Sequence, residues 1–515
     1  MSTSPAIGGF GRTPAFSRLA FLLGPLLAAL VAAGLLIGAP FLSRSLLLLC
    51  LGLVAFVVGL WASGNPRLLC LWGLIASSPL SVAKKWQPVP HMGGVGALQV
   101  EAPDIFLAML CAFILRDLST GHLRWRFPVP ARWWLALTVW GVASLIRGPI
   151  RMASAEQMIQ MGKELLFFLV LVNELVRARQ FTQVVTAIAI VITGLSLIGF
   201  AEFLHHGSLG FEFLGEANDE ELRYAAQATY MDASGVFRIG SLIGHPNLFA
   251  ATLSLMLPLL MASMFTPLGP LRRLVVGAGL LTGGVALILT LSRTAWLSFG
   301  LSFVALLAFG AAHPRIRGRF VRLRLAMVGA LGLGVVAALP QIIKRLTASD
   351  PGALNFRYEW MAVAWQFVKQ QPIFGLGLNT FVFHLPDSTK YGDAQGLSQH
   401  FGDIWPVVHN IYLIIWSEQG TVGMILFTAT YISLFFVGFR NMKHLVDERM
   451  YMLNLGCVAG MFSTVIDGMS SFYLRNTQCA RCFWLVAAMC VAISYWQKAN
   501  ARLENVRLVR GPGGP

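Results

Sequence analysis

Residues 182–204 read TQVVTAIAIVITGLSLIGFAEFL, an apolar run of 23 residues in which Glu202 is the one charged residue. A run of about 20 apolar residues is long enough for a helix to cross the roughly 30 Å hydrocarbon core of a bilayer. Similar runs recur along the chain, and they are continuous rather than alternating as barrel strands are. The sequence therefore predicts an all-α, polytopic integral membrane protein.

The composition of the whole chain supports this prediction. Of its 515 residues, 56% are hydrophobic and only 12% are charged, and the mean hydropathy is +0.68. A soluble protein of this length cannot bury that much apolar surface. The twelfth run, at 407–439, is long enough for its helix to be tilted or broken. We predict about 12–14 transmembrane helices and place fourteen, at 19–39, 45–63, 67–83, 104–116, 132–146, 160–176, 182–204, 245–265, 274–291, 295–312, 325–340, 407–439, 451–472 and 479–496.

The net charge of +16 follows from membrane orientation. With the N-terminus in the cytoplasm, the basic stretches fall inside, including RIRGRFVRLR from Arg315 to Arg324, as the positive-inside rule requires. We therefore expect no nucleic-acid partner, a multi-pass membrane protein, and both termini in the cytoplasm. The same orientation places two long loops outside, at 205–244 and 341–406. Loops of this length are usually functional.

Five segments follow from this topology. The chemistry is expected in the third, because both long outer loops belong to it. The segments are a cytosolic N-terminal tail (1–18), N-terminal transmembrane helices (19–204), a candidate catalytic domain with the periplasmic loop 341–406 (205–440), C-terminal transmembrane helices (441–496) and a basic cytosolic tail (497–515).

Three arginines are predicted on the outer face. Arg238 lies in GVFRIGSLIGHPN, Arg293 in TLSRTAW, and Arg357 in NFRYEW, where residues 354–370 have an amphipathic helical pattern. A guanidinium is a planar fork that suits phosphate, so three converging arginines would form an anion site. The alternatives are an interfacial side chain or an ion pair with an acid. For Arg293, a cation at the C-terminal end of a helix is a further alternative.

His409 begins the twelfth predicted span in WPVVHNIYLIIW. An imidazole with a near-neutral pKa can take a proton from a hydroxyl group, so His409 is a candidate general base. The alternative is an interfacial, hydrogen-bonded histidine. Asn410 would orient His409 or cap the helix. His245 is a second candidate contact residue, although Pro246 beside it also makes an ordinary helix start.

Other groups have simpler interpretations. Asp467 and Arg475 are eight residues apart, which favours a structural ion pair if the helix continues. The acids from Glu216 to Glu221 favour a solvated loop over a metal site. Cys479 and Cys482 form a CxxC with no further ligands near in sequence, so small apolar residues on a helix are favoured over a redox pair. We expect no metal and no P-loop.

The pattern around His409 is the most specific motif in the chain. His409-Asn410 is followed after nine residues by Gly420 and after two more by Gly423. Between about residues 238 and 423 the chain resembles the bacterial O-antigen ligase and polymerase superfamily, whose pattern here is His-[Asn/Ser/Gln]-x9-Gly-x2-Gly. Three accompanying motifs carry the same resemblance: Ser292-Arg293; Arg357-x2-Trp360 followed by Pro372-x2-Gly375-x-Gly377-x3-Phe381; and Arg238 with Gly244-x2-Asn247.

The resemblance implies a GT-C-like glycosyltransferase architecture and a reaction. Members transfer a glycan from undecaprenyl diphosphate, on the periplasmic side, to an acceptor hydroxyl. The acceptor is a lipid A-core sugar in ligases, or another lipid-linked glycan in polymerases of O-antigen or exopolysaccharide. No metal, cofactor or nucleotide is implied, and the partners are the donor, the acceptor, the lipid bilayer and polysaccharide assembly proteins. His409 would be the base, Arg238, Arg293 and Arg357 would bind diphosphate, and Asn410, His245 and Arg475 would support them.

Two other functions compete with this one. A flippase or transporter of lipid-linked oligosaccharides would have charges within the spans of both halves and an internal repeat, whereas the polar residues here concentrate in outer loops of the second half. A metal-dependent glycosyltransferase that uses polyprenyl-phosphate sugars would have acids in a long first outer loop. The loop near Ser43–Ser45 is short and has none. The choice between ligase and polymerase stays open.

Overall fold

The computed structural model describes residues 64–86, 94, 96–147, 151–178, 180–217, 237–312, 329, 332, 339, 343, 351–385, 407–445 and 447–510. The chain divides into two compact units, residues 1–73 and 74–515. The predicted spans at 19–39 and 45–63, and most of the span at 325–340, lie outside the described residues. Helix α3 (Pro66–Ser77) crosses the boundary between the two units.

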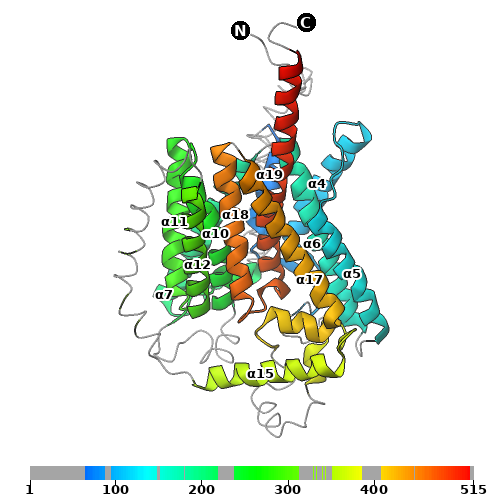
Figure 1. The fold of residues 1–515 in the computed structure, drawn as a ribbon. Helices are drawn as coiled ribbons and strands as arrows, with labels where there is room; N and C mark the ends of the chain where they lie inside the picture. Colours follow the sequence, from blue (N-terminus) through cyan, green and yellow to red (C-terminus); the bar gives the residue numbers. More distant parts are fainter. Residues whose placement is uncertain are drawn as a thin grey trace, which may run out of the picture. The chain divides into compact units, whose positions relative to one another are not determined.

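The second unit is a bundle of helices with one further helix across its end (Figure 1). We call this end the α15 end. The helices that run along the bundle are α4 (Ala102–Ser119), α5 (Val129–Arg147), α6 (Arg151–Ala178), α7 (Phe181–His205), α10 (Pro246–Met264), α11 (Pro270–Leu289), α12 (Arg293–Ala312), α17 (Ile411–His444), α18 (Glu448–Asp467) and α19 (Thr477–Arg510), and α15 (Pro351–Gln370) lies across the end.

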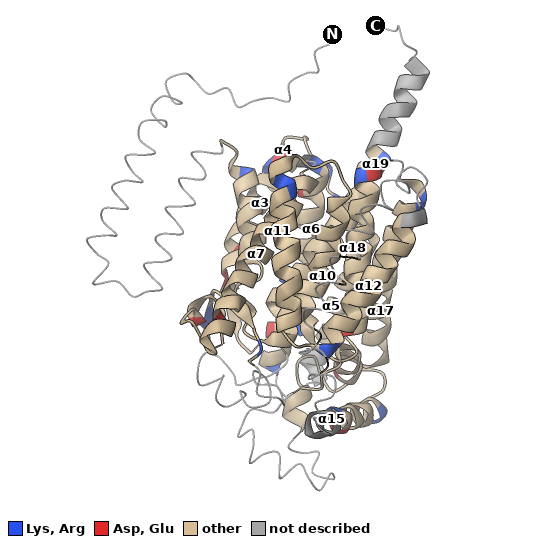
Figure 2. Ribbon diagram, turned by 90° about the vertical axis from the view of Figure 1, so that its left-hand side faces the viewer, with Lys and Arg blue, Asp and Glu red and all other residues tan. Residues whose placement is uncertain are grey.

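Seven of the described helices are long and apolar enough to cross a membrane: α7, α10, α11, α12, α17, α18 and α19. The protein is therefore an all-α, multi-pass membrane protein, as predicted. The apolar window of α10 is 89% buried and those of α18 and α19 are 83% buried, whereas that of α11 is 28% buried. Helices α10, α18 and α19 thus form the interior, and α11 presents most of its surface outward. Lys, Arg, Asp and Glu gather toward the ends of the bundle (Figure 2).

Several short elements lie between the helices. Strands β1 (Ala83–Trp86) and β2 (Leu98–Glu101) form an antiparallel hairpin in which Ala83 pairs with Glu101. The sequence did not predict this hairpin, and its first strand begins inside the weak run at 67–83. Four 3-10 turns complete the described elements: η2 (Glu212–Leu214), η3 (Ser241–Ile243), η4 (Phe381–His384) and η6 (Tyr473–Arg475).

A buried ion pair joins β2 to α19. Arg481 lies 2.7 Å from Glu101, and both side chains are almost fully buried. Arg481 also donates hydrogen bonds to the carbonyl oxygens of Ser78 and Leu80, and Thr477 donates one to Glu101. A buried charge is tolerated only with such partners, so this cluster fixes α19 against the start of α4.

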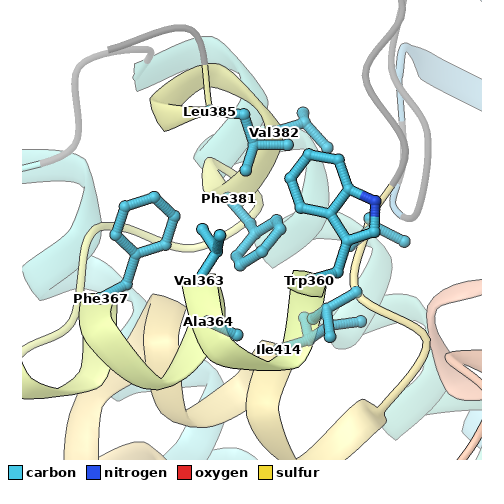
Figure 3. Close-up of a cluster of buried hydrophobic side chains, with 10 residues drawn as sticks. Trp360, Val363, Ala364, Phe367, Phe381, Val382, Leu385 and Ile414 are labelled. Carbon is cyan, nitrogen blue, oxygen red and sulfur yellow. The ribbon is translucent and has the colours of Figure 1, made fainter. Parts of the chain in front are cut away.

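Helix α15 is the amphipathic helix predicted near 354–370. Its apolar face packs on η4 and on the start of α17 (Figure 3). Trp360 and Phe367 of α15 contact Phe381 of η4 and Ile414 of α17 within one buried cluster. The long helix α17 is interrupted at Gly420, whose φ of 64° and ψ of −169° are not helical. The predicted break in the 407–439 run is therefore confirmed.

Candidate active site

Arg238 joins three parts of the bundle at the α15 end. Its side chain is buried, Nε donates a hydrogen bond of 2.9 Å to the Thr290 carbonyl, and Nη2 donates one of 2.6 Å to the side-chain oxygen of Asn247. Thr290 is the C-cap of α11, where carbonyl groups have no partner within the helix. Arg238 therefore supplies the cation at the C-terminus of α11, an arrangement that favours a positive charge.

Arg293 is the first residue of α12 and is exposed. The turn before it contains Leu291 at a φ of 52°, a conformation that costs energy for a residue with a side chain. The hydroxyl of Ser470 donates a hydrogen bond of 2.8 Å to that of Thr294. This bond ties the start of α12 to the segment after α18, beside the residues described next.

His409 lies immediately before α17. Its ring packs edge-on against Phe472, with ring centroids 5.2 Å apart. Asn410 is the N-cap of α17 and accepts hydrogen bonds from the backbone N–H groups of Tyr412 and Leu413. Its amide also donates to the Met469 carbonyl, at 3.1 Å. The predicted cap is thus present, and it fixes His409 against the end of α18.

His245 is the corresponding residue at the start of α10. It is the N-cap of that helix, and its Nδ1 accepts a hydrogen bond of 3.1 Å from the Asn247 backbone N–H. Pro246 occupies the first helical position, so the ordinary helix start is also confirmed. Asn247 thus contacts both His245 and Arg238, and it couples the two side chains.

Four of the candidate residues interact electrostatically with one another. Burial, and then the charges of Arg238, His409 and Arg357, together lower the pKa of His245 to about 3. Burial and then the charge of Arg357 lower the pKa of His409 to about 4, while a hydrogen bond with the Val407 backbone opposes this. Arg238 and His245 come from the segment before α10, Arg357 from α15 and His409 from the segment before α17, yet the four form one cationic cluster in which both histidines are neutral at pH 7.

The expected ion pair between Asp467 and Arg475 is wrong. Helix α18 ends at Asp467, the chain turns before η6, and Arg475 instead forms a buried ion pair with Glu418. An eight-residue spacing places two side chains on one face only where the helix continues. Arg475 therefore supports α17 rather than the end of α18.

Asp467 lies beside the cluster. Its carboxyl group is buried, and Oδ2 has no hydrogen-bond partner among the residues that the structure describes. It interacts electrostatically with Arg357 and with Tyr412. The sequence did not single out Glu418 or Asp467 as site residues: Asp467 interacts with Arg357 of the cluster, and Glu418 pairs with Arg475. The signal for Glu418 was its place inside the nine-residue interval of the His409 motif.

Other candidates are structural or lie elsewhere. Glu216 accepts hydrogen bonds from the backbone N–H groups of Leu209 and Phe211, so it folds its own loop. The rest of the acidic run, 219–221, lies outside the described residues. Cys479 and Cys482 are free and buried in α19, where the apolar interpretation fits. Within the described part of the chain, no group of three or more His, Cys, Asp or Glu could hold a metal ion.

Comparison with known families finds a match that includes part of this end of the bundle. Residues 278–428 match the family model described as O-antigen ligase. Over these residues the chain is similar to the O-antigen ligase family. No curated protein matches the chain. The match confirms the resemblance to the O-antigen ligase and polymerase superfamily, and it contains the motifs of Ser292-Arg293, Arg357 and His409.

The range that matches the O-antigen ligase family does not contain the whole cluster. Arg293, Arg357 and His409 lie within the matched range, whereas Arg238 and His245 precede it and Asp467 follows it. The packing of α10 and α18 in the interior brings these residues beside the matched range. The similarity of residues 278–428 to the O-antigen ligase family is the basis for the proposal below.

Proposed function

We propose that this protein is an inner-membrane glycosyltransferase that transfers or polymerises a glycan carried on undecaprenyl diphosphate, on the periplasmic face. One observation carries the proposal: Arg238, His245, Arg357 and His409 form one cationic cluster around neutral imidazoles at the end of a membrane-spanning bundle. The O-antigen ligase match covers two of the four, Arg357 and His409.

The arginines suit the leaving group. When the glycosidic bond breaks, negative charge develops on the diphosphate oxygen that departs, and preorganised cations stabilise that charge most. Arg357 of α15 and Arg293 of α12 are the proposed contacts, because both are accessible from the α15 end. Arg238 is buried and bonded to Thr290 and Asn247, so its contribution is to hold the cluster together and to add positive charge.

His409 suits the acceptor. Its pKa of about 4 keeps the imidazole neutral at pH 7, so a nitrogen can accept a proton. Nδ1 of His409 has no hydrogen-bond partner among the described residues. A bound diphosphate would offset the charge of Arg357 and raise the pKa of His409 toward the range in which a base is effective.

The proposed reaction is an inverting displacement at the anomeric carbon of the donor glycan. The acceptor oxygen attacks the anomeric carbon while His409 takes the hydroxyl proton. The bond from that carbon to the phosphate oxygen breaks, and its electron pair stays on the undecaprenyl diphosphate. The products are the new glycoside with inverted configuration, the lipid diphosphate and a protonated His409. The donor supplies the energy, so the proposal requires neither a nucleotide nor a metal.

The experiment uses a deletion strain complemented with wild type, His409→Ala or His444→Ala. His444 lies at the other end of α17 and is the matched control. Lipopolysaccharide and carrier-linked glycans are resolved by gel and mass spectrometry. If the strain without activity accumulates long glycan on the carrier and its core lipid A stays bare, the protein is a ligase. If that strain contains only single repeat units, the protein is a polymerase. If His409→Ala complements fully, the assignment of His409 as the general base is wrong, and the flippase or transporter alternative is favoured.

A further inference from the structure

The segment after α15 is attached to the interruption in α17. The backbone N–H of Gly377 donates to the Glu418 carbonyl at 2.9 Å, and the N–H of Thr421 donates to the Pro372 carbonyl at 2.7 Å. A Cβ atom on Gly420 would collide with the Ile373 carbonyl group. The two backbones therefore approach too closely for a side chain at this position, which explains why glycine stands at the break.

The carboxylate of Glu418 completes this attachment. Oε2 accepts a hydrogen bond of 2.9 Å from the Asn379 N–H, and Oε1 accepts one of 3.1 Å from the Phe381 N–H. Asn379 has a φ of 62°, so the loop is held in a conformation that it would not adopt freely. Arg475 forms the ion pair that compensates the buried charge of Glu418.

This attachment determines where α15 lies. Phe381 packs on α15 in one cluster with Trp360 and Phe367, so the carboxylate and the apolar cluster both hold the turn that contains Phe381 (Figure 3). Trp360 is three residues from Arg357, on the same helix. Glu418 is nine residues after His409, roughly 14 Å along α17. One side chain thus connects the helix that carries Arg357 with the helix that begins beside His409.

We propose that Glu418, neutralised by Arg475, is a positioning residue that holds α15 so that Arg357 lies against His409. It touches neither donor nor acceptor. The proposal rests on the proposed function only in the claim that this position serves glycosyl transfer. That Glu418 fixes the position of Arg357 relative to His409 is a separate claim, and it is measured separately.

That measurement is the modification of His409 by diethyl pyrocarbonate, which reacts with neutral imidazole and is quantified by mass spectrometry. The charged or titratable groups that interact with His409 are Arg357 from α15 and His245 from the start of α10. Arg238 acts in turn on His245, and Asp467 of α18 interacts with Arg357. In the wild type the rate should fall only near pH 4, since burial and then the charge of Arg357 keep the imidazole neutral above that pH. If α15 shifts, the fall moves toward the ordinary value of 6.5.

The variants are Glu418→Gln, Arg475→Met and the double variant. Each single variant leaves a buried charge or a buried set of donors without its partner, whereas the double variant removes both charges. We expect each single variant to slow transfer at least about tenfold and to raise the pH at which modification falls. The double variant should recover part of both losses. Glu418→Asp keeps the charge with one methylene fewer and provides a milder displacement.

The matched control is Glu101→Gln, which breaks a buried ion pair of α19 far along the chain from this loop. It should leave the modification profile of His409 unchanged. The proposal is overturned if Glu418→Gln and Arg475→Met, recovered as folded protein, give the wild-type profile, or if Glu101→Gln shifts it equally. If His409→Ala turns out to be active, the proposed function fails, yet the profile still reports whether Glu418 positions Arg357.

Discussion

Nε of Arg238 donates a hydrogen bond of 2.9 Å to the carbonyl oxygen of Thr290, across 52 residues of sequence. This contact joins the segment before α10 to the turn that leads into Arg293. A predicted anion-binding residue therefore also stabilises the fold, because the same guanidinium closes α11 and contacts Asn247 beside His245.

Arg238→Lys should therefore destabilise the protein and reduce transfer. A single ammonium cannot reach both acceptors in the geometry of a guanidinium fork, and a buried acceptor left without a donor costs about 1–3 kcal/mol. Thermal unfolding in detergent measures the loss. Arg177→Lys is the control, because its ion pair with Asp117 is more exposed. Equal melting temperatures for both variants would contradict the role of Arg238.

Arg293→Lys should fold normally and transfer poorly. Arg293 is exposed, and lysine keeps its positive charge and much of its length. A point charge cannot make the two parallel hydrogen bonds with which a guanidinium binds phosphate, so we expect a loss of about tenfold or more in kcat/KM for the donor. Initial rates at varied donor concentration provide the test. Full activity would count against bidentate diphosphate binding.

The pH dependence of transfer should change in Arg357→Gln. Arg357 lowers the pKa of His409, so removing its charge raises that pKa from about 4, although burial keeps it below 6.5. The protonated imidazole cannot act as a base, and the acid limb of kcat/KM should therefore move to higher pH. The profile of Arg357→Gln is compared with that of the wild type. An acid limb that stays in place would show that Arg357 does not act on His409.

The sequence predicted the helices well where the apolar runs are long. The run at 182–204 corresponds to α7, Phe181–His205, and the run at 245–265 to α10, Pro246–Met264. The hairpin of β1 and β2 was missed because four-residue strands next to a weak apolar run have too little pattern. Local spacing could predict the cap at Asn410, but it could not predict the partner of Arg475. A cap is a contact between neighbours, whereas Arg475 meets Glu418 across 57 residues.

The candidate site was predictable as residues but not as an arrangement. The sequence predicted all four members of the cluster, Arg238, His245, Arg357 and His409. Its spacing paired Asp467 with Arg475 and did not place it beside them. Only the packing of α18 against α10 and α17 places its carboxyl group near Arg357. Long-range packing of this kind leaves no periodic signal in the chain.

Chelation provides an independent test of the mechanism. Because the proposal assigns charge stabilisation to arginines, transfer should persist at an undiminished rate after treatment with EDTA. The measurement compares initial rates before and after chelation, with Mg²⁺ added back. A strict requirement for a divalent ion would favour the metal-dependent class of glycosyltransferase instead.

The most direct test of the central claim is glycosyl transfer by purified protein in detergent. The donor is a defined undecaprenyl-diphosphate glycan, and the acceptors are core lipid A and a second donor molecule. We expect wild type and His444→Ala to form product at similar rates, and His409→Ala, equally folded, to be at least about a hundredfold slower. Product formation by His409→Ala at the wild-type rate would contradict the account.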